Sequence, residues 1–411
     1  MPILSNKRIV LGVTGSIAAY KGADLASKLA QAGAQVDVIL TGAAEKFVTP
    51  LTFQSVTGRR AFTDNDLWGN EAHVLHVGLS HAADLLIIAP CTANTIAKLA
   101  HGQADGLLAV TALAMRSPLL IAPAMDGGMY NHPATQENIE TLKKRGATFI
   151  GPAEGHLASG LSGVGRMLET AEIIGHIHLV LGREGLLAGK KIIVTAGGTQ
   201  EPLDPVRVIT NRSSGKQGYA LAQTALEMGA QVTLITTPTA LTPPVGVRLV
   251  PVQTAKQMLE AVLEESAKSD ALVMAAAVAD FRPKNTARDK IKKEGGLPQI
   301  ELEATEDILK TVAEKRAASQ CPRVVVGFAA ESRDLLENAA HKLKSKGLDF
   351  IVANDISATN AGFAVETNRV TLLFKDGRKD VLPLMSKSEV SEVILGWVSK
   401  LLESYANSGH L

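Results

Sequence analysis

The sequence has only two cysteines, few aromatic residues and almost no net charge, and each shortage excludes a class of protein. Cys91 and Cys321 lie in different halves of the 411-residue chain, which excludes a disulfide framework and a cysteine-rich zinc site. Lysine and arginine number 42 against 41 acidic residues, giving a formal net charge of +1. There is no electrostatic footprint for nucleic acid or an anionic membrane, so small-molecule ligands are expected.

No apolar run is long enough for a transmembrane helix. The most apolar stretch, 107–125, is broken by Arg116, Ser117 and Pro118, and we predict a helix, a turn and a buried strand there. The opening residues pass from a polar cap into a strand, without the apolar core and cleavage site of a signal peptide. We therefore expect a soluble, cytoplasmic protein.

What the sequence does contain is one plan used twice. An apolar strand at 8–14, a helical pattern to Ala32 and a strand at 36–40 form a βαβ unit. Residues 191–195 repeat the opening strand, and Gly-Ala-Gln-Val occurs at 33–36 and again at 229–232. Because the chain is also too long for one core, we predict two tandem doubly wound, Rossmann-like parallel-sheet domains, 1–185 and 190–411.

Later apolar segments extend both sheets. Strands are expected at 85–89, 119–122 and 148–150 in the first half and at 271–277, 324–328 and 350–353 in the second, because parallel strands buried on both faces are uniformly apolar. Residues 370–374 and 379–382 predict a hairpin around Asp376-Gly377.

The first βα loop differs between the halves. The opening strands are 183 residues apart and the Gly-Ala-Gln-Val segments 196, so the second unit carries 13 extra residues, which fall in loop 199–218. This loop lies where such folds bind phosphate against a helix N-terminus, and its Asn211 to Lys216 segment directly precedes a helix. We therefore expect different ligands in the two halves, with a flexible surface loop as the alternative.

In the first half, small polar groups follow the strand ends, where open α/β sheets bind ligands. They are Gly15, Ser16, Thr41 and the segment 90–95. The spacing is not the G-x-G-x-x-G of dinucleotide folds, so a single phosphate such as that of FMN is favoured over NAD. Tight turns without a ligand remain an alternative.

Two further features of the first half can each be interpreted in two ways. His76 lies in an apolar segment before a buried strand. It is interpreted either as a functional group or as a core histidine whose hydrogen bonds are satisfied. The glycine-rich stretch 151–167 is too polar for a strand and too rich in glycine for a helix. It is expected to be a mobile lid or a surface linker.

These motifs together resemble a known family. TGSIAAYKG (14–22), PCTANTIAKLAHG (90–102) and PAMDGGMYNHPATQ (123–136) are similar to flavin-dependent cysteine decarboxylases that make 4'-phosphopantetheine. Residues 190–360 are similar to phosphopantothenate-cysteine ligases. The whole chain therefore resembles the bifunctional phosphopantothenoylcysteine decarboxylase/phosphopantothenate-cysteine ligases of coenzyme A biosynthesis.

The resemblance implies a flavodoxin-like first domain that binds FMN as an electron sink for decarboxylation. It implies that His76 is catalytic, that Ser159 holds the position of the final proton donor, and that Asp126 and Met129 bind substrate. The implied FMN contacts are Gly15, Ser16, Thr41, Thr92, Ala93 and Asn94.

Two of these positions depart from the commoner family pattern. Ser159 stands where a cysteine often donates the proton, and a serine hydroxyl is a far weaker acid than a thiol, whose pKa is about 8.5. Asp126 stands where an asparagine often binds the substrate carboxylate, which an ionised aspartate would repel.

For the second half the resemblance implies CTP-dependent ligation through an acyl-cytidylate, with Mg²⁺ bound to the phosphates. The sequence itself does not decide between CTP and ATP. Asn211 and Lys290 are the implied catalytic residues. Asn211 would hold a carboxylate oxygen, and Lys290 would neutralise charge on the phosphates. The implied CTP contacts are Met274, Ala275, Ala276, Asp280, Lys290, Glu306, Asp307, Ile308, Leu309, Phe328, Lys342 and Lys346.

The family further implies a homo-oligomer with a trimer-based decarboxylase core and paired ligase domains. Two other functions stay open. One is an active ligase whose flavin half is a noncatalytic FMN-binding or oligomerisation module, and the other is a nucleotide-sensing protein without catalysis.

Overall fold

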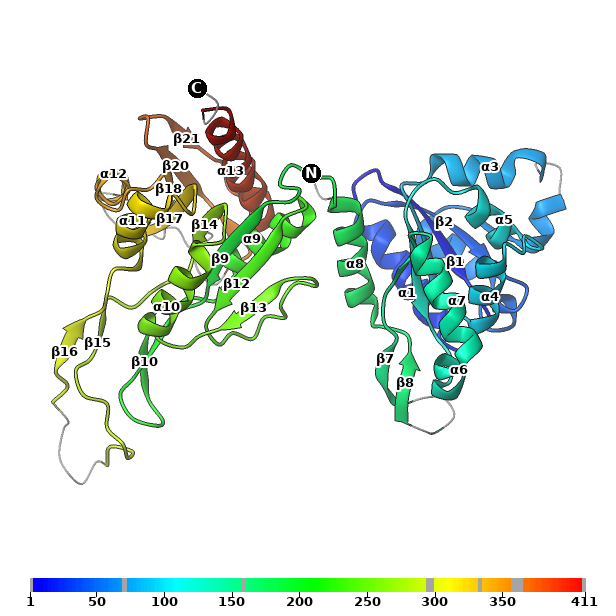
Figure 1. Ribbon diagram of the computed structural model, residues 1–411, viewed down its shortest axis with the longest axis horizontal. Helices are drawn as coiled ribbons and strands as arrows, with labels where there is room; N and C mark the ends of the chain where they lie inside the picture. The colour runs from blue at the N-terminus through cyan, green and yellow to red at the C-terminus, as the bar shows by residue number, and fades with distance from the viewer. Residues whose placement is uncertain are drawn as a thin grey trace. The chain divides into compact units, whose positions relative to one another are not determined.

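The chain folds into two compact units, residues 1–181 and 182–411. The computed structural model describes residues 3–68, 72–156, 160, 162–292, 299–331, 335–355 and 365–408. In each unit, helices pack on a central sheet (Figure 1).

The first unit is built on a six-stranded parallel sheet in the order β3-β2-β1-β4-β5-β6. Its strands are β1 (Arg8–Val13), β2 (Gln35–Leu40), β3 (Ala61–Thr63), β4 (Leu85–Cys91), β5 (Leu119–Pro123) and β6 (Thr148–Phe149). Alternate residues of β1 enter different cores, Ile9 and Leu11 on one face and Val10 on the other, which explains the uniformly apolar strands. The chain order reverses between β1 and β4, the point at which open sheets bind ligands.

Helices cover both faces of this sheet. α1, α2 and α8 contribute to one core, and α3, α4, α5 and α7 to the other. α1 ends before Gly33, whose φ of 91° lies in the left-handed region that favours glycine. The helices are α1 (Ala19–Gln31), η1 (Ala44–Lys46), α2 (Pro50–Thr57), η2 (Asp64–Trp68), α3 (Ala72–Ala82), α4 (Ala93–His101), α5 (Leu107–Ala114), α6 (Gly127–Asn131), α7 (Pro133–Lys144) and α8 (Thr170–Gly182).

The glycine-rich stretch after β6 forms a hairpin, which corrects the prediction that it is too polar for a strand. β7 (Ala153–His156) pairs antiparallel with β8 (Ser162–Arg166). Gly165, with φ of 150°, approaches the backbone so closely that an added Cβ would lie 2.2 Å from the Met125 carbonyl oxygen. Glycine is therefore required there by backbone packing.

The second unit repeats the same strand order. Its eight-stranded sheet runs β13-β12-β9-β14-β17-β18-β20-β21, and the first six strands are parallel. The two doubly wound domains predicted from the repeats are confirmed. The strands are β9 (Lys191–Ala196), β12 (Gln231–Thr236), β13 (Arg248–Pro251), β14 (Ala271–Met274), β17 (Val324–Glu331), β18 (Phe350–Asp355), β20 (Val370–Phe374) and β21 (Lys379–Val381).

Two predicted strands end three residues away from the predicted position, and the other strand ends differ by at most two residues. β14 ends at Met274 instead of 277, because the next residues turn away to line a cavity. β17 runs on to Glu331, beyond the predicted end at 328. The hairpin around Asp376-Gly377 is present, with β20 and β21 antiparallel.

Five helices and three short antiparallel pairs complete the described part of this unit. α10, α11 and α12 share one core with the sheet, and α9 packs on β9, β12 and α13. The helices are α9 (Lys216–Glu227), α10 (Ala255–Ser266), α11 (Ile308–Ser319), α12 (Leu335–Ser345) and α13 (Lys387–Ser408). The pairs are β10 (Gln200–Pro202) with β11 (Val208–Thr210), β15 (Phe281–Pro283) with β16 (Leu302–Ala304), and β19 (Thr367–Asn368) with β22 (Met385–Ser386).

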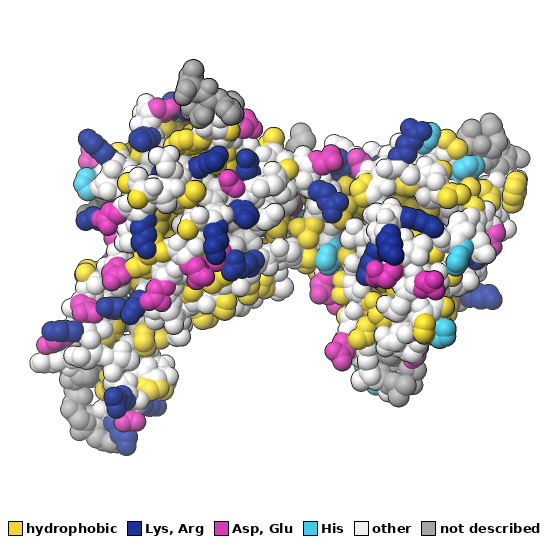
Figure 2. Space-filling model, viewed as in Figure 1, with side chains coloured by type: hydrophobic (Ala, Val, Ile, Leu, Met, Phe, Trp, Pro, Cys, Tyr) yellow, Lys and Arg dark blue, Asp and Glu magenta, His cyan; other side chains and the backbone are white. Residues whose placement is uncertain are grey.

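On the face in Figure 2, basic and acidic side chains are interspersed over each unit. Among the residues that the structure describes, no helix combines the length and the apolar character that crossing a membrane requires.

Candidate functional sites

The first unit holds a cavity of about 420 Å³ at the C-terminal ends of its strands, which we call the N-unit cavity. It combines apolar walls with a few hydroxyl and charged groups, as small-molecule sites do. It is lined by Gly15, Ser16, Ile17, Ala18, Tyr20, Lys21, Thr92, Ala124, Met125, Asp126, Met129, His156, Gly165, Arg166 and Met167.

Thr14 ties two of the cavity's loops together. Its hydroxyl donates to the Pro90 carbonyl at 2.8 Å and accepts from the Thr92 N–H at 3.0 Å. Thr92 in turn caps α4, because its hydroxyl accepts from the Thr95 N–H. The loop after β1 and the start of α4 are thus held in fixed register at the cavity.

Three of the six predicted FMN contacts, Gly15, Ser16 and Thr92, line the cavity. Ala93 and Asn94 do not line it and are the first residues of α4. Thr41 follows β2 and is not among the lining residues. Its hydroxyl instead accepts from the Ala44 N–H.

Asp126 and Met129 both line the cavity from α6. Asp126 is the N-cap of this helix, and its Oδ1 accepts from the Gly128 N–H at 2.9 Å. Met129 is 51% exposed. The departure at Asp126 therefore places a carboxylate at the cavity wall.

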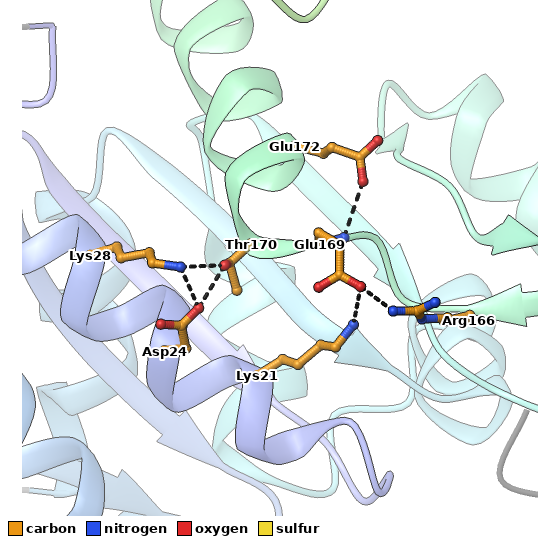
Figure 3. A network of polar contacts seen from close by, with 7 residues as sticks. All are labelled: Lys21, Asp24, Lys28, Arg166, Glu169, Thr170 and Glu172. Atoms are coloured by element: carbon orange, nitrogen blue, oxygen red, sulfur yellow. Dashed lines mark hydrogen bonds and ion pairs between the residues drawn. The ribbon is translucent and has the colours of Figure 1, made fainter. Parts of the chain in front are cut away.

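Basic and acidic side chains join the cavity wall to the hairpin and α8 (Figure 3). Glu169 accepts from the buried Lys21 at 2.9 Å and also pairs with Arg166. The hydrogen bond from Lys21 holds the pKa of Glu169 below its usual range. Nearby, Lys28 and Thr170 similarly lower the pKa of Asp24.

Of the two remaining residues assigned to decarboxylation, His76 and Ser159, the structure describes His76 alone. His76 lies on α3 and does not line the cavity. Its Nδ1 is buried and has no hydrogen-bond partner among the described residues. Ser159 lies outside the described residues.

The second unit holds a cavity of about 370 Å³, which we call the C-unit cavity. It gathers residues that the ligase resemblance assigns to CTP from four separate segments, the loop after β14, the start of α11, β17 and α12. These are Met274, Ala275, Ala276, Asp280, Glu306, Asp307, Ile308, Leu309, Phe328, Lys342 and Lys346.

Two local interactions shape this wall. Asp307 caps α11 by accepting from the Lys310 N–H at 3.2 Å, and its other oxygen lies 3.1 Å from the Lys346 ammonium group. Thr305 also lines the cavity, and its hydroxyl donates to the Ala279 carbonyl at 2.6 Å.

The two predicted catalytic residues do not line the C-unit cavity. Asn211 is adjacent to it, because its side-chain amide donates to the carbonyl oxygens of Ala277 and Val278 at 3.3 and 3.0 Å, and both of those residues line the cavity. Lys290 is exposed in the segment between β15 and β16.

The cavity includes side chains that the sequence analysis did not assign, Asn354, Asn368 and Lys387. Asn354 follows an expected buried strand, so its position at a strand end was a usable signal. Asn368 and Lys387 come from β19 and the start of α13, and no motif marked them. Burial lowers the pKa of the Lys387 ammonium group, an effect that Glu366 opposes.

Across the described ranges, no group of three or more histidine, cysteine, aspartate or glutamate side chains is arranged to hold an ion.

Comparison with known proteins identifies families for both units. Residues 3–182 match the Flavoprotein family, and residues 187–402 match the DNA/pantothenate metabolism flavoprotein C-terminal domain family. The chain is 46% identical over 402 residues to the coenzyme A biosynthesis bifunctional protein CoaBC of Bacillus subtilis (strain 168), covering 97% of this chain and 98% of that protein.

Two further relatives carry the same name. Identity is 43% over 397 residues with the protein of Vibrio cholerae serotype O1 (strain ATCC 39315 / El Tor Inaba N16961), covering 96% of this chain and 98% of the relative. Identity is 45% over 401 residues with that of Mycobacterium tuberculosis (strain ATCC 25618 / H37Rv), covering 95% of each. The chain therefore belongs to the family of bifunctional coenzyme A biosynthesis proteins, which confirms the family predicted from its motifs.

Proposed function

We propose that this chain catalyses two consecutive steps of coenzyme A biosynthesis. Residues 190–411 couple 4'-phosphopantothenate with cysteine at the expense of CTP, and residues 1–185 decarboxylate the product to 4'-phosphopantetheine with FMN. The observation that carries the proposal is the C-unit cavity, where eleven of the twelve residues assigned to CTP line one space. The free cysteines fit a reducing cytoplasm.

In the ligase half, the substrate carboxylate attacks the α-phosphorus of CTP and breaks its bond to pyrophosphate. The cysteine amine then attacks the acyl carbon and releases CMP. Asn211, held beside the cavity by two carbonyl contacts, would bind the carboxylate or acyl-phosphate oxygen. Lys290, Lys342 and Lys346 would neutralise charge that develops on the phosphates.

The lining of the N-unit cavity has the chemistry that FMN needs. A flat ring needs apolar walls, which Ile17, Met125 and Met167 provide. A phosphate needs donors, and Ser16 offers a hydroxyl while the first turn of α4 offers N–H groups without helical acceptors. Bound FMN would supply the hydride acceptor that makes loss of CO₂ from a saturated carbon possible.

Around that group, the chain's own residues would orient the substrate. Asp126 and Met129 stand on the α6 wall, and Lys21 and Arg166, which both pair with Glu169, bring positive charge to the lining. Phosphopantothenoylcysteine carries anionic groups at both ends, so we assign the two cations to binding and Asp126 to the wall beside the substrate.

The position of His76 supports a homo-oligomer. Because its buried Nδ1 has no partner among the described residues and it does not line the cavity of its own chain, we infer that α3 of a second copy brings His76 to the site. A trimer-based decarboxylase core with paired ligase units is the assembly that we propose.

Assaying both half-reactions on the purified chain tests this function. We expect CTP-dependent release of pyrophosphate that requires phosphopantothenate and cysteine, release of CO₂ from phosphopantothenoylcysteine, and the absorbance of FMN in the purified protein. Ligation with bound FMN but without CO₂ release would instead support the noncatalytic flavin module, an alternative that the carboxylate of Asp126 at the cavity favours. Nucleotide binding with neither reaction would support a sensor.

A further inference from the structure

The C-unit cavity has two buried amide oxygens that no group in the described part of the chain satisfies. Asn354 is 7% exposed and Asn368 is 1% exposed, both line the cavity, and the Oδ1 atom of each has no hydrogen-bond partner among the described residues. They lie on neighbouring strands, because Asn354 is opposite Val370 in the β18–β20 ladder and Asn368 ends β19 just before it. A buried polar atom without a partner costs free energy, so each awaits a donor from a ligand.

The orientation of Asn368 is fixed by a chain of hydrogen bonds. The Gln217 Nε2 donates to the Lys387 carbonyl oxygen at 3.2 Å and to the Ser391 hydroxyl at 3.0 Å. Since a carbonyl oxygen can only accept, the amide of Gln217 cannot be reversed, and its Oε1 must accept from the Asn368 Nδ2 at 2.9 Å. The free end of Asn368 is therefore an acceptor, which excludes direct contact with an unprotonated phosphate oxygen.

Positive charge surrounds these acceptors. Lys216 and Lys387 also line the cavity, with Lys216 paired to Glu366 and the Lys387 ammonium group donating to the Val365 carbonyl. Lys216 opens α9 directly after Gly215, the N-cap, so N–H groups of the first helical turn lie at the same wall. Two ammonium groups and a helix N-terminus favour a polyanion.

A magnesium polyphosphate satisfies both the amide acceptors and the positively charged groups of this wall. The phosphate oxygens can accept from the lysines and the helix N-terminus, but at neutral pH they carry no hydrogen for Asn354 or Asn368. Mg²⁺ prefers oxygen ligands, keeps several of its waters and is bound through few protein groups plus substrate phosphates. The waters on Mg²⁺ can donate hydrogen bonds to the two amide oxygens. Neutral amide oxygens are suitable partners for the hydrated ion in a site that also holds lysines.

We propose that Asn354 and Asn368 bind the hydrated Mg²⁺ of the nucleotide, while Lys216 and Lys387 bind its phosphate tail. This inference rests on the proposed ligase function and adds to it the position of the metal and of the leaving pyrophosphate. The nucleoside then occupies the other part of the cavity, lined by Met274, Asp280 and Phe328.

Calorimetric titration of the full chain with α,β-methylene-CTP, in Mg²⁺ and in EDTA, tests the inference without turnover. In the wild type, Mg²⁺ should tighten binding. Asn354→Leu and Asn368→Leu should lose roughly 10- to 100-fold of that enhancement, the usual effect of removing groups that support a metal, with the affinity in EDTA unchanged. Lys387→Met should weaken binding in both buffers.

Two matched variants separate metal binding from damage to the fold. Asn354→Asp keeps an acceptor oxygen, and the Mg²⁺ enhancement should persist or grow. Asn338→Leu, an exposed position on α12, should match the wild type. If Asn368→Leu does not fold because Gln217 loses its donor, Asn354→Leu decides the question.

The outcomes distinguish this inference from the function on which it rests. An undiminished Mg²⁺ enhancement in folded Asn354→Leu overturns the metal position while leaving CTP binding intact. A wild-type chain that binds the analogue in neither buffer overturns the proposed ligase function itself. As an independent check, Mn²⁺ with the analogue should give a protein-bound electron paramagnetic resonance signal that Asn354→Leu weakens.

Discussion

Lys21 and Glu169, separated by 148 residues in the sequence, form an ion pair with 2.9 Å between Nζ and Oε1. The Lys21 side chain is 11% exposed and that of Glu169 is 54% exposed. Because Glu169 also pairs with Arg166 at the end of β8, one carboxylate joins α1 to the hairpin beside the N-unit cavity. This contact holds α1 and the hairpin together at the cavity wall. No sequence motif indicated that these two segments would meet.

We predict that Glu169→Gln destabilises the first unit at neutral pH and that the difference disappears in acid. The pKa of Glu169 is lowered in the folded state, so its contribution is fully present above the unfolded value of about 4.3 and is lost as pH falls through the folded value. Since Glu169 is half exposed, the loss at pH 7 should be at most about 1 kcal/mol. Thermal unfolding of the full chain between pH 3.5 and 7 measures it.

Glu140→Gln is the matched control for this prediction. Glu140 pairs with Lys143 on the surface of α7, and both side chains are about half exposed, so its replacement should leave the unfolding temperature unchanged. A Glu169→Gln difference that stays constant across the pH range would show that the carboxylate charge is not what stabilises the wall.

A second prediction concerns Lys290, which lies outside the C-unit cavity on the segment between β15 and β16. If this lysine reaches the phosphates only when substrates are bound, Lys290→Gln should lower the CTP-dependent rate by roughly 10- to 1000-fold and leave FMN binding unchanged. Lys284→Gln is the control, because Lys284 is on the same segment and pairs with Glu301 in solvent. Equal ligase rates for the two variants would remove Lys290 from the mechanism.

A third prediction follows from the separation of His76 and the N-unit cavity within one chain. His76→Asn and Ser16→Trp should each lose decarboxylation, the first by removing the histidine and the second by filling the cavity. Mixed oligomers, formed by coexpressing the two variants, should regain activity because some sites combine an intact cavity with an intact His76. Ligase activity of each variant reports folding, and mixtures no more active than the parents would place both groups in the same subunit.

The doubly wound sheets could be predicted because apolar strands, glycine turns and the repeated Gly-Ala-Gln-Val segment are local signals. Eleven of the twelve CTP-assigned residues also gather in one cavity, to which β14, α11, β17 and α12 all contribute. Strand ends converge there by topology alone.

What could not be predicted depends on contacts between distant segments. Asn368 and Lys387 follow no motif, and they reach the cavity only because β19 pairs with β22 before α13. The hairpin at 153–166 has a polar, glycine-rich sequence, and Gly165 is required there only because the Met125 carbonyl oxygen, from a distant segment, leaves no room for a Cβ atom. Long-range pairing of this kind leaves no periodicity in the sequence.

The last prediction concerns Asp126, where asparagine is common in the family. Asp126 caps α6 through Oδ1, and an asparagine carbonyl can accept the same N–H group, so Asp126→Asn should fold as the wild type does. With the negative charge removed beside the proposed substrate carboxylate, the KM for decarboxylation at pH 7 should fall about tenfold, or ~1.4 kcal/mol, while the ligase rate stays constant. Asp126→Ala separates the two roles, because it also removes the charge but loses the cap, at a cost of about 1 kcal/mol. Steady-state CO₂ release, measured with all three proteins, decides the matter. If Asp126→Asn raises KM or leaves it unchanged, the carboxylate does not face the substrate's, and Asp126 serves α6 alone.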